Sequence, residues 1–163
     1  SEDFNIFENY IIPQGKYEWW YQIIQLETKG ARNIWGEATY GFGDFYNGYR
    51  KDIILKANWK VAVPLFIGTT VTRNNIELPE GNFTANIYQV NANILFSPDL
   101  TLYNYFQYDN ASRSAGWQSR FQWILKPGNE IILAWTSNFI KPADAFFMDE
   151  SAVRLKLKYN IRF

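Results

Sequence analysis

The C-terminal stretch of this chain alternates between apolar and polar side chains. In residues 153–163 (VRLKLKYNIRF) every odd position is apolar and every even position is polar or cationic. Successive side chains of a β-strand point to opposite faces, so this period of two predicts a strand with one apolar and one polar face. The same alternation runs through residues 53–61, 88–96 and 115–125. The chain is therefore predicted to be all-β.

Turn residues divide the chain at regular intervals and form two interleaved series. The short series comprises residues 28–31 (TKGA), 63–64 (VP), 97–99 (SPD) and 126–129 (KPGN). The other series is mostly longer and comprises residues 13–15, 46–48, 78–81, 109–116 and 140–151. Strands that are joined in sequence by such turns form an antiparallel up-and-down meander, in which one end carries tight turns and the other carries loops.

Between the turns lie about ten segments of strand length. They are residues 3–10, 16–27, 32–45, 49–62, 65–76, 83–96, 99–108, 114–126, 130–140 and 152–163. A sheet of this many long strands must curl, and closure removes its exposed edges. The predicted fold is a single domain over residues 1–163. It is an antiparallel up-and-down transmembrane β-barrel of about ten strands, or the C-terminal part of a larger barrel.

Composition excludes several classes of function. The chain has no Cys and no His, which removes disulfide scaffolds, thiolate and imidazole metal sites, and catalysis by Cys or His. Its 16 cationic and 16 acidic residues balance, which argues against a nucleic-acid partner. No cofactor or metal is predicted, because the loop carboxylates Asp144, Asp149, Glu150, Glu77 and Glu80 match no defined calcium loop.

Aromatic content points to a lipid bilayer. The chain contains 7 Trp, 11 Tyr and 13 Phe, and rings on the apolar faces cluster toward the strand ends. Aromatic rings collect in this way at the two interfaces of a membrane. The predicted interface aromatics are Trp20, Phe42, Trp59, Phe96, Tyr108, Trp117, Trp123 and Phe139. The alternative is a soluble barrel with its apolar face turned inward around a small ligand, because alternation alone does not choose between the two.

The last strand ends on an aromatic residue. This terminal pattern resembles the assembly signal of bacterial outer-membrane barrels, and the residues that carry it are Leu157, Tyr159, Ile161 and Phe163. The resemblance implies an outer membrane of a Gram-negative bacterium, with the barrel-assembly machinery as a partner during biogenesis. The short turns are then periplasmic, and an even number of strands places both termini in the periplasm.

Several turn motifs extend a resemblance over nearly the whole chain. They are residues 12–19 (IPQGKYEW), 43–48 (GDFYNG), 75–83 (NIELPEGNF), 96–100 (FSPDL) and 126–130 (KPGNE). In order and spacing they resemble the barrel part of a bacterial outer-membrane domain of unknown function that follows a carbohydrate-binding-family-nine-like domain. Members of that family are usually longer, with an N-terminal module and more strands. The resemblance therefore implies that the chain corresponds to the C-terminal part.

Charged side chains are predicted on the inner, lumen-facing side of the strands. A cationic row there favours anions and sets pore selectivity, or it pairs with acidic residues on further strands. Its members are Lys56, Lys60, Arg120, Arg154, Lys156, Lys158 and Arg162. Glu27 and Glu37 are also predicted on this face. They are more simply read as ion-pair partners of the lysines than as an acid–base pair, so we predict no enzyme.

The function predicted from the sequence is that of an integral outer-membrane β-barrel. It acts as a membrane-spanning pore, or as an anchor or scaffold that presents extracellular loops or holds a partner. Its partners are the lipid bilayer and, as a further expectation, another protein or additional barrel strands. The alternatives are a soluble small-ligand-binding barrel and the membrane part of a surface carbohydrate-handling protein.

Overall fold

The computed structural model describes residues 4–7, 10–12, 15–28, 30–142 and 145–160. These residues form one sheet of nine strands and a separate sheet of two strands. The strands are β1 (Phe4–Phe7), β2 (Tyr10–Ile12), β3 (Tyr21–Glu27), β4 (Ile34–Phe45), β5 (Gly48–Ala62), β6 (Leu65–Leu78), β7 (Gly81–Ser97), β8 (Leu100–Asp109), β9 (Ser114–Lys126), β10 (Asn129–Ile140) and β11 (Phe147–Lys158).

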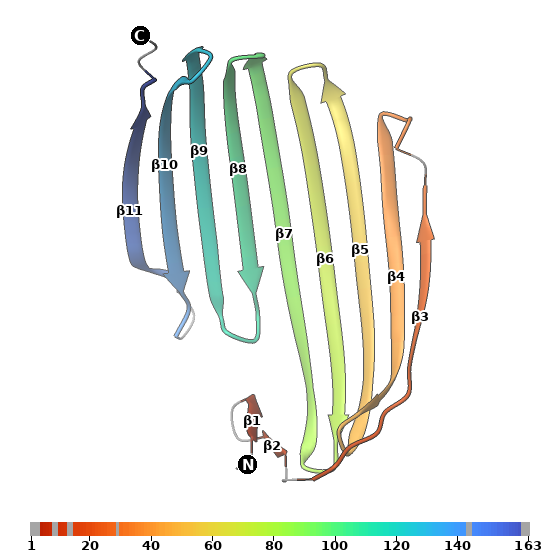
Figure 1. Cartoon of the computed structure of the whole chain (residues 1–163). Helices are drawn as coiled ribbons and strands as arrows, with labels where there is room; N and C mark the ends of the chain where they lie inside the picture. The colour runs from red at the N-terminus through yellow and green to blue at the C-terminus, as the bar shows by residue number, and fades with distance from the viewer. Residues whose placement is uncertain (1–3, 8–9, 13–14, 29, 143–144, 161–163) are drawn as a thin grey trace.

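The large sheet is an antiparallel up-and-down meander. Its strands lie in the order β11-β10-β9-β8-β7-β6-β5-β4-β3, so each strand pairs with its neighbours in sequence (Figure 1). All eight pairings are antiparallel. This confirms the prediction of an all-β, up-and-down antiparallel fold. No helix with the length and apolar character needed to cross a membrane occurs among the residues described above.

Sequence patterns account for most of the strand boundaries. The turn at Val63 and Pro64 separates β5 from β6, and the turn at Pro127 and Gly128 separates β9 from β10. Proline removes a backbone donor and fixes its own φ, so it ends a strand, while Gly128 takes a φ of +90° that favours glycine. These tight turns place consecutive strands side by side.

The N-terminal segment departs from the prediction. Residues 3–10 were expected to add a tenth strand to the barrel, but Phe4–Phe7 pairs with Tyr10–Ile12 in a two-stranded sheet of its own. The large sheet therefore has nine strands and not ten. Only a short linker separates the two halves of this segment, so they fold back on each other instead of extending along β3.

The loop end of the sheet also differs from the prediction. The β6–β7 connection was expected between strands that end at residue 76 and begin at residue 83, yet it leaves only residues 79–80 outside strands. The β4–β5 turn at residues 46–47 lies within the predicted turn at 46–48. The connections at 110–113 and 141–146 are longer, as expected. The reason is that β6 and β7 continue to Leu78 and from Gly81, so residues expected in a loop are part of the sheet.

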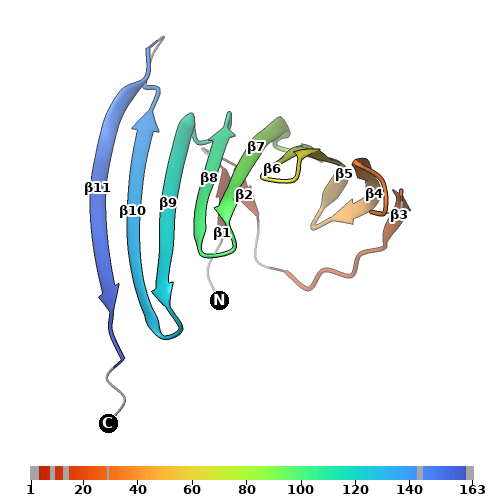
Figure 2. The same ribbon diagram turned by 90° about the horizontal axis from the view of Figure 1, so that it is seen from above.

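The sheet is curved and its two edges are open. Figure 2 shows it bending from β11 round to β3, and these two strands have no second neighbour among the described residues. Few apolar side chains of the described chain are buried, namely Ile76, Leu78 and Ala115. The sheet is thus a single layer held together by its backbone ladder and by side chains that touch across neighbouring strands.

Candidate functional site: two faces of one curved sheet

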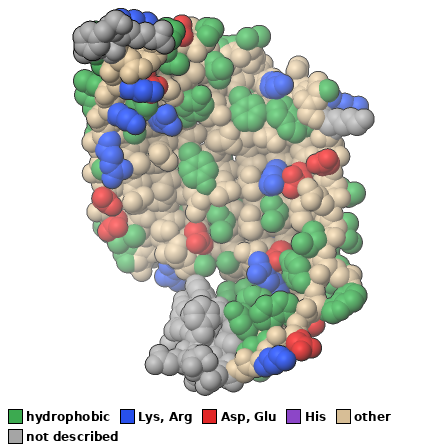
Figure 3. All heavy atoms as spheres, in the orientation of Figure 1, with side chains coloured by type: hydrophobic (Ala, Val, Ile, Leu, Met, Phe, Trp, Pro, Cys, Tyr) green, Lys and Arg blue, Asp and Glu red, His purple; other side chains and the backbone are tan. Residues whose placement is uncertain are grey.

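Cross-strand register assigns each sheet residue to one of two faces. Leu55 lies opposite Val71, and Val71 lies opposite Tyr88. Directly opposed residues point to the same side of a sheet. We call this side the outer face, and the opposite side, which carries Lys56, the inner face. The inner face lies on the concave side of the sheet and is turned toward the viewer in Figure 3.

The outer face carries a continuous band of large apolar side chains, which we call the apolar band. On β10 it extends over the eight-residue interval from Ile131 to Phe139. That interval spans about 27 Å, close to the roughly 25 Å apolar height of membrane barrels. These side chains contact no second layer, and Leu133 at the centre is 42% exposed. Exposed members of the band include Leu26, Ile53, Leu55, Trp59, Tyr88, Val90, Phe106, Trp123, Trp135, Val153, Leu155 and Leu157.

Polar side chains within the apolar band are hydrogen-bonded inside the protein. The Thr69 hydroxyl donates to the carbonyl of Gln89 over 3.1 Å, and the Asn104 amide donates to the carbonyl of Ala92 over 3.3 Å. The indole of Trp135 donates to a serine hydroxyl on the next strand over 2.9 Å. Polar groups surrounded by apolar side chains are paired within the protein in this way, because those side chains offer no hydrogen-bond partner.

The loop-end limit of the apolar band lies near one row of paired residues over β5–β10. Direct pairings join Leu55, Val71, Tyr88, Tyr108, Ala115 and Phe139 in this row. On β11 the residue opposite Phe139 is Met148, which is also exposed.

The predicted interface aromatics fall mostly on the outer face. Tyr108 and Phe139 lie in one row at the loop-end limit, and Trp59 and Trp123 lie toward the tight turns. Trp117 lies one row further into the band, where its ring centre is 5.0 Å from that of Trp135. The remaining three lie apart: Phe42 opposite Lys51, Phe96 at the irregularity between Leu95 and Ser97, and Trp20 before β3.

Beyond the apolar band, strands β5, β6 and β7 project further than β8, and the end of β4 stays paired with β5 (Figure 1). We call residues 48–52, 72–78 and 81–87 the loop-end extension. On its outer face the side chains become polar: Lys51, Asn75 and Thr84 form one row, and Glu77 and Asn82 pair beyond it. The Lys51 ammonium lies 3.4 Å from the Glu77 carboxylate. The outer face therefore changes from apolar to charged along the same three strands.

The inner face of the loop-end extension changes in the opposite direction. Ile76 and Leu78 are 8% and 6% exposed, and both point to the inner side. Rings from the segment before β3 lie against the β4–β5 turn, with the Trp19 and Tyr46 ring centres 5.1 Å apart. Figure 3 shows apolar side chains gathered at this end of the inner face. A small apolar core therefore occupies the inner side where the outer side is polar.

A buried carboxylate lies at the junction between the two regions. Asp52 is 6% exposed, accepts a hydrogen bond from the Tyr21 hydroxyl and lies 2.6 Å from Nε of Arg50. A side chain at Gly41 would occupy the space that the Tyr21 hydroxyl fills. At Gly43, with a φ of +156°, a side chain would overlap the backbone of Trp20. These two glycines let β3 lie close to β4 so that Tyr21 reaches Asp52.

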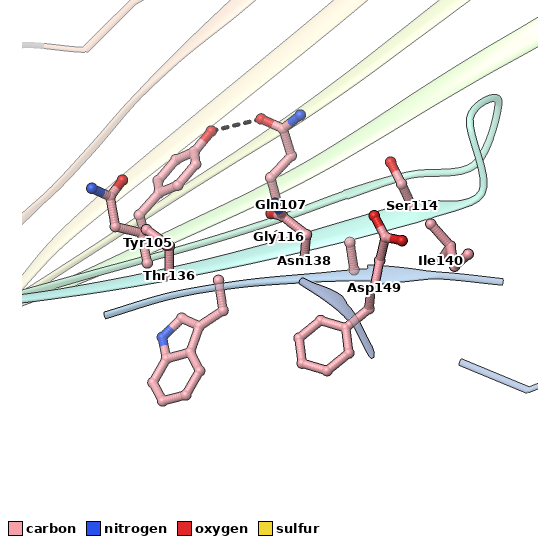
Figure 4. Close-up of a pocket in the computed structure, with 12 residues that line it drawn as sticks. Tyr105, Gln107, Ser114, Gly116, Thr136, Asn138, Ile140 and Asp149 are labelled. Atoms are coloured by element: carbon pink, nitrogen blue, oxygen red, sulfur yellow. Dashed lines mark hydrogen bonds between the residues drawn. The ribbon is translucent and has the colours of Figure 1, made fainter. Parts of the chain in front are cut away.

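Level with the apolar band, the inner face is polar and largely uncharged over β6–β9. The Gln89 amide donates to the Tyr105 hydroxyl and to Gln107, over 2.8 and 3.0 Å, and the Tyr105 hydroxyl donates to Gln107 over 2.7 Å. A hollow of about 450 Å³ opens beside this network. Figure 4 shows Tyr105, Gln107, Ser114 and Asp149 on the same side of the sheet around it.

The predicted cationic residues lie on the inner face, except Arg162, which falls outside the described residues. Direct pairings place Lys60, Arg120 and Arg154 in one row across the sheet. They do not form one cluster, because neutral side chains of β6–β8 separate the β5 lysines from the cations of β9–β11. In Figure 3 cationic side chains gather over β9–β11 at the tight-turn end.

Several of these cations have partners on the inner face. Lys56 lies 2.9 Å from the Glu37 carboxylate, and Lys158 lies 3.5 Å from that of Glu130. Glu37 pairs directly with Glu27 across β3–β4, so both carboxylates do share this face. In the described chain no group of carboxylates is arranged to hold a metal ion. Glu37 makes an ion pair with Lys56, and Glu27, Glu37 and Lys56 line a hollow of about 290 Å³.

The predicted assembly signal is partly visible. Leu157 pairs with Ile131 on the outer face, and the Lys126 ammonium lies 5.8 Å from the centre of the Tyr159 ring. Ile161 and Phe163 fall outside the described residues. The strand that carries the signal begins at Phe147 and ends at Lys158, earlier at both ends than the predicted 152–163.

Two features of the site were missed by sequence reasoning. The change of polarity in the loop-end extension has a signal, because Ile76 and Leu78 are out of phase with the outer-face residues Val71 and Thr69. The cluster around Asp52 has none, because Tyr21, Arg50 and Asp52 are brought together only by the register of β3, β4 and β5.

Sequence comparison with protein families and with curated proteins found no match. The resemblance to the outer-membrane domain family therefore stays a prediction.

Proposed function

We propose that these nine strands form part of the wall of an integral outer-membrane β-barrel. Closure of such a wall brings the outer face against lipid and the inner face around a lumen. The turn motifs and the alternating pattern of β11 support a Gram-negative outer membrane, with the tight turns and the end of β11 on the periplasmic side. Because the sheet has nine strands, β3 begins at the opposite, loop end, so the expectation that both ends of the chain are periplasmic does not fit this sheet. The bilayer is then the principal partner, and the barrel-assembly machinery acts during biogenesis.

The observation that carries the proposal is the reversal of face polarity at one level of the sheet. Within the apolar band the outer face is apolar and the inner face is polar; in the loop-end extension both are reversed. A membrane surface at this level explains the change on the outer face, because that face passes from lipid into water there. A soluble ligand carrier would place its apolar side chains on the concave side throughout.

The inner face favours a pore over a packed anchor. Over β6–β9 it carries amides and hydroxyls that bond to one another, such as Gln89, Tyr105 and Gln107. A narrow anchor barrel fills its interior with interlocking side chains, whereas a wide barrel encloses water. The polar concave surface, with its open hollow, fits a water-filled lumen that passes hydrophilic solutes. We propose no catalytic role.

Cysteine labelling tests the membrane proposal directly, because the native chain has no cysteine to interfere. The variants Leu133→Cys and Ala134→Cys place one thiol on the outer and the inner face of β10 at the same height. After refolding into phosphatidylcholine vesicles and labelling with a polarity-sensitive fluorophore, lipid-borne nitroxide quenches the label at position 133 several-fold more than at 134. Asn75→Cys, on the outer face of the extension, stays unquenched.

The same preparation separates the competing functions. The protein should float with the vesicles in a density gradient. Failure to float, or equal quenching at positions 133 and 134, would contradict the membrane proposal and favour the soluble carrier. Single-channel conductance in a planar bilayer then distinguishes a pore from an anchor: stepwise currents support the pore, and vesicle binding without current supports the anchor.

A further inference from the structure

The direction of the two edge strands limits how the sheet can be completed. Eight antiparallel pairings separate β3 from β11, so these edge strands run in the same direction. Membrane barrels pair neighbouring strands antiparallel. A direct β3–β11 seam would be parallel. To close the sheet into a barrel in which every pair of neighbouring strands is antiparallel, an odd number of strands must be added between β11 and β3.

Strand β11 has an open edge to which another strand can be added. Its twelve residues form a long edge whose outer-face side chains Val153, Leu155 and Leu157 are 66%, 63% and 68% exposed. An open edge leaves backbone donors and acceptors without partners, and hydrocarbon supplies none. An added strand satisfies these groups and extends the apolar band.

The inner face of β11 defines the chemistry of its neighbour. Arg154 and Lys156 point to this face, and neither forms an ion pair within the part of the chain that the structure describes. On the interior side they pair with Ala134 and Ile132, which offer no charge. A strand on the open side of β11 is therefore the position from which carboxylates can reach these two cations.

A second copy of this chain does not fit the edge. If the β11 strands of two copies paired antiparallel with their outer faces on the same side, the two copies would have to cross the membrane in opposite directions. If β11 paired with the β3 of a copy inserted in the same orientation, the seam would be parallel, because β3 and β11 run in the same direction. Neither arrangement gives an antiparallel seam between copies inserted in the same orientation.

We infer that β11 accepts an antiparallel β-strand with Glu or Asp at alternate positions opposite Arg154 and Lys156, and with large apolar side chains on its outer face. This is strand addition with a defined side-chain pattern. The inference rests on the proposed membrane barrel, since the bilayer makes the open edge unfavourable. The row Arg154–Lys156 then sets the choice of neighbouring strand.

The test uses peptides of defined pattern as probes. The full chain with Leu155→Cys is refolded in dodecylmaltoside micelles and mixed with an eleven-residue peptide that alternates Leu and Glu, with Cys at the central Leu. A twin peptide carries Lys in place of Glu. Under mild oxidation, the amount of disulfide-linked complex reports pairing at the β11 edge. We expect at least tenfold more capture of the acidic peptide.

Charge reversal provides the decisive comparison. Adding Arg154→Glu and Lys156→Glu should invert the preference, so that the Lys peptide is captured instead. The matched control is Lys51→Glu with Arg73→Glu, which changes charge equally on the outer face of the loop-end extension and should leave the preference intact.

Three results would overturn the inference: equal capture of both peptides, a preference that survives the reversal, or a homodimer of the Leu155→Cys chain, linked through its introduced thiol, as the main product. Flotation and labelling at position 133 report separately on the membrane proposal. If both peptides are captured equally and the protein still floats with the vesicles, only the inference about the added strand is contradicted. If the protein does not float, the proposed function is contradicted.

Discussion

The apolar band and the loop-end extension are built from the same three strands, yet their faces have opposite polarity. In the band, Leu55, Val71 and Tyr88 form an apolar row on the outer face. Four residues along the strands, Lys51, Asn75 and Thr84 form a polar row on that face, while Ile76 and Leu78 are buried on the other. Backbone pairing continues unchanged through the junction. Environment, and not strand geometry, therefore decides which face of a sheet is apolar.

The largest expected effect comes from a charge placed in the band. Leu133→Arg should destabilise the protein in vesicles by about 2–4 kcal/mol, because in the proposed membrane barrel the guanidinium faces the hydrocarbon centre. Asn75→Arg puts the same side chain on the outer face of the extension and should leave stability nearly unchanged. Urea titration of both variants in phosphatidylcholine vesicles measures the difference, and equal midpoints would remove the distinction between the two regions.

The next effect lies in the small core of the extension. Leu78→Ala should cost about 2–3 kcal/mol, because the side chain is 6% exposed and its loss leaves a cavity. The same substitution at Leu125, which is 53% exposed, should cost less, since in the proposed membrane barrel lipid tails fill the vacated space. Unfolding midpoints in vesicles give the comparison. A larger loss at Leu125 would show that the extension has no core of its own.

A smaller effect is expected at the junction. Tyr21→Phe removes the hydroxyl that donates to Asp52 and should lower stability by about 1 kcal/mol. Gly41→Ala should act in the same direction by displacing the Tyr21 ring. Tyr103→Phe is the control, because that hydroxyl makes no hydrogen bond within the described residues. If Tyr21→Phe and Tyr103→Phe unfold at the same urea concentration, the junction cluster contributes nothing.

The smallest effect concerns the ion pair on the outer face of the extension. Lys51→Met should change the stability by less than about 0.5 kcal/mol, since Lys51 and Glu77 are both exposed to water. Urea midpoints at low and high salt measure this directly. A loss several times larger would mean that this surface is removed from water, and the membrane level would then have to be moved outward along β5–β7.

Much of the sheet is predictable from sequence because one environment acts on each face over long stretches. The alternation around Trp59 and Trp123, and the turns at Pro64 and Pro127, gave strands close to β5, β9 and their neighbours. The faces of Lys56, Arg120 and Lys156 follow from the same period. Where a strand passes from one environment to another, its apolar side chains switch from one face to the other. The alternation in the sequence is then interrupted, and a strand is predicted as a loop.

Other features depend on contacts that no local pattern carries. The separate β1–β2 sheet depends on residues 4–7 pairing with residues 10–12 and not with the large sheet. The irregularity between Asn138 and Phe139 shifts the phase of β11, so its first residues could not be assigned. The ring contact between Tyr108 and Phe146 likewise depends on where the last loop folds.

The projection of β6 and β7 has an electrostatic consequence at the proposed membrane surface. From Tyr88 at the edge of the apolar band to Gly81 at the tip, the strand rises by about 20 Å. At physiological ionic strength the field of a charged surface decays over about 8 Å. In the proposed membrane barrel, the tip of this hairpin therefore stands outside the field of the lipid headgroups. A molecule that reaches it meets the charges of the protein itself, such as Glu77 and Glu80, and not those of the membrane.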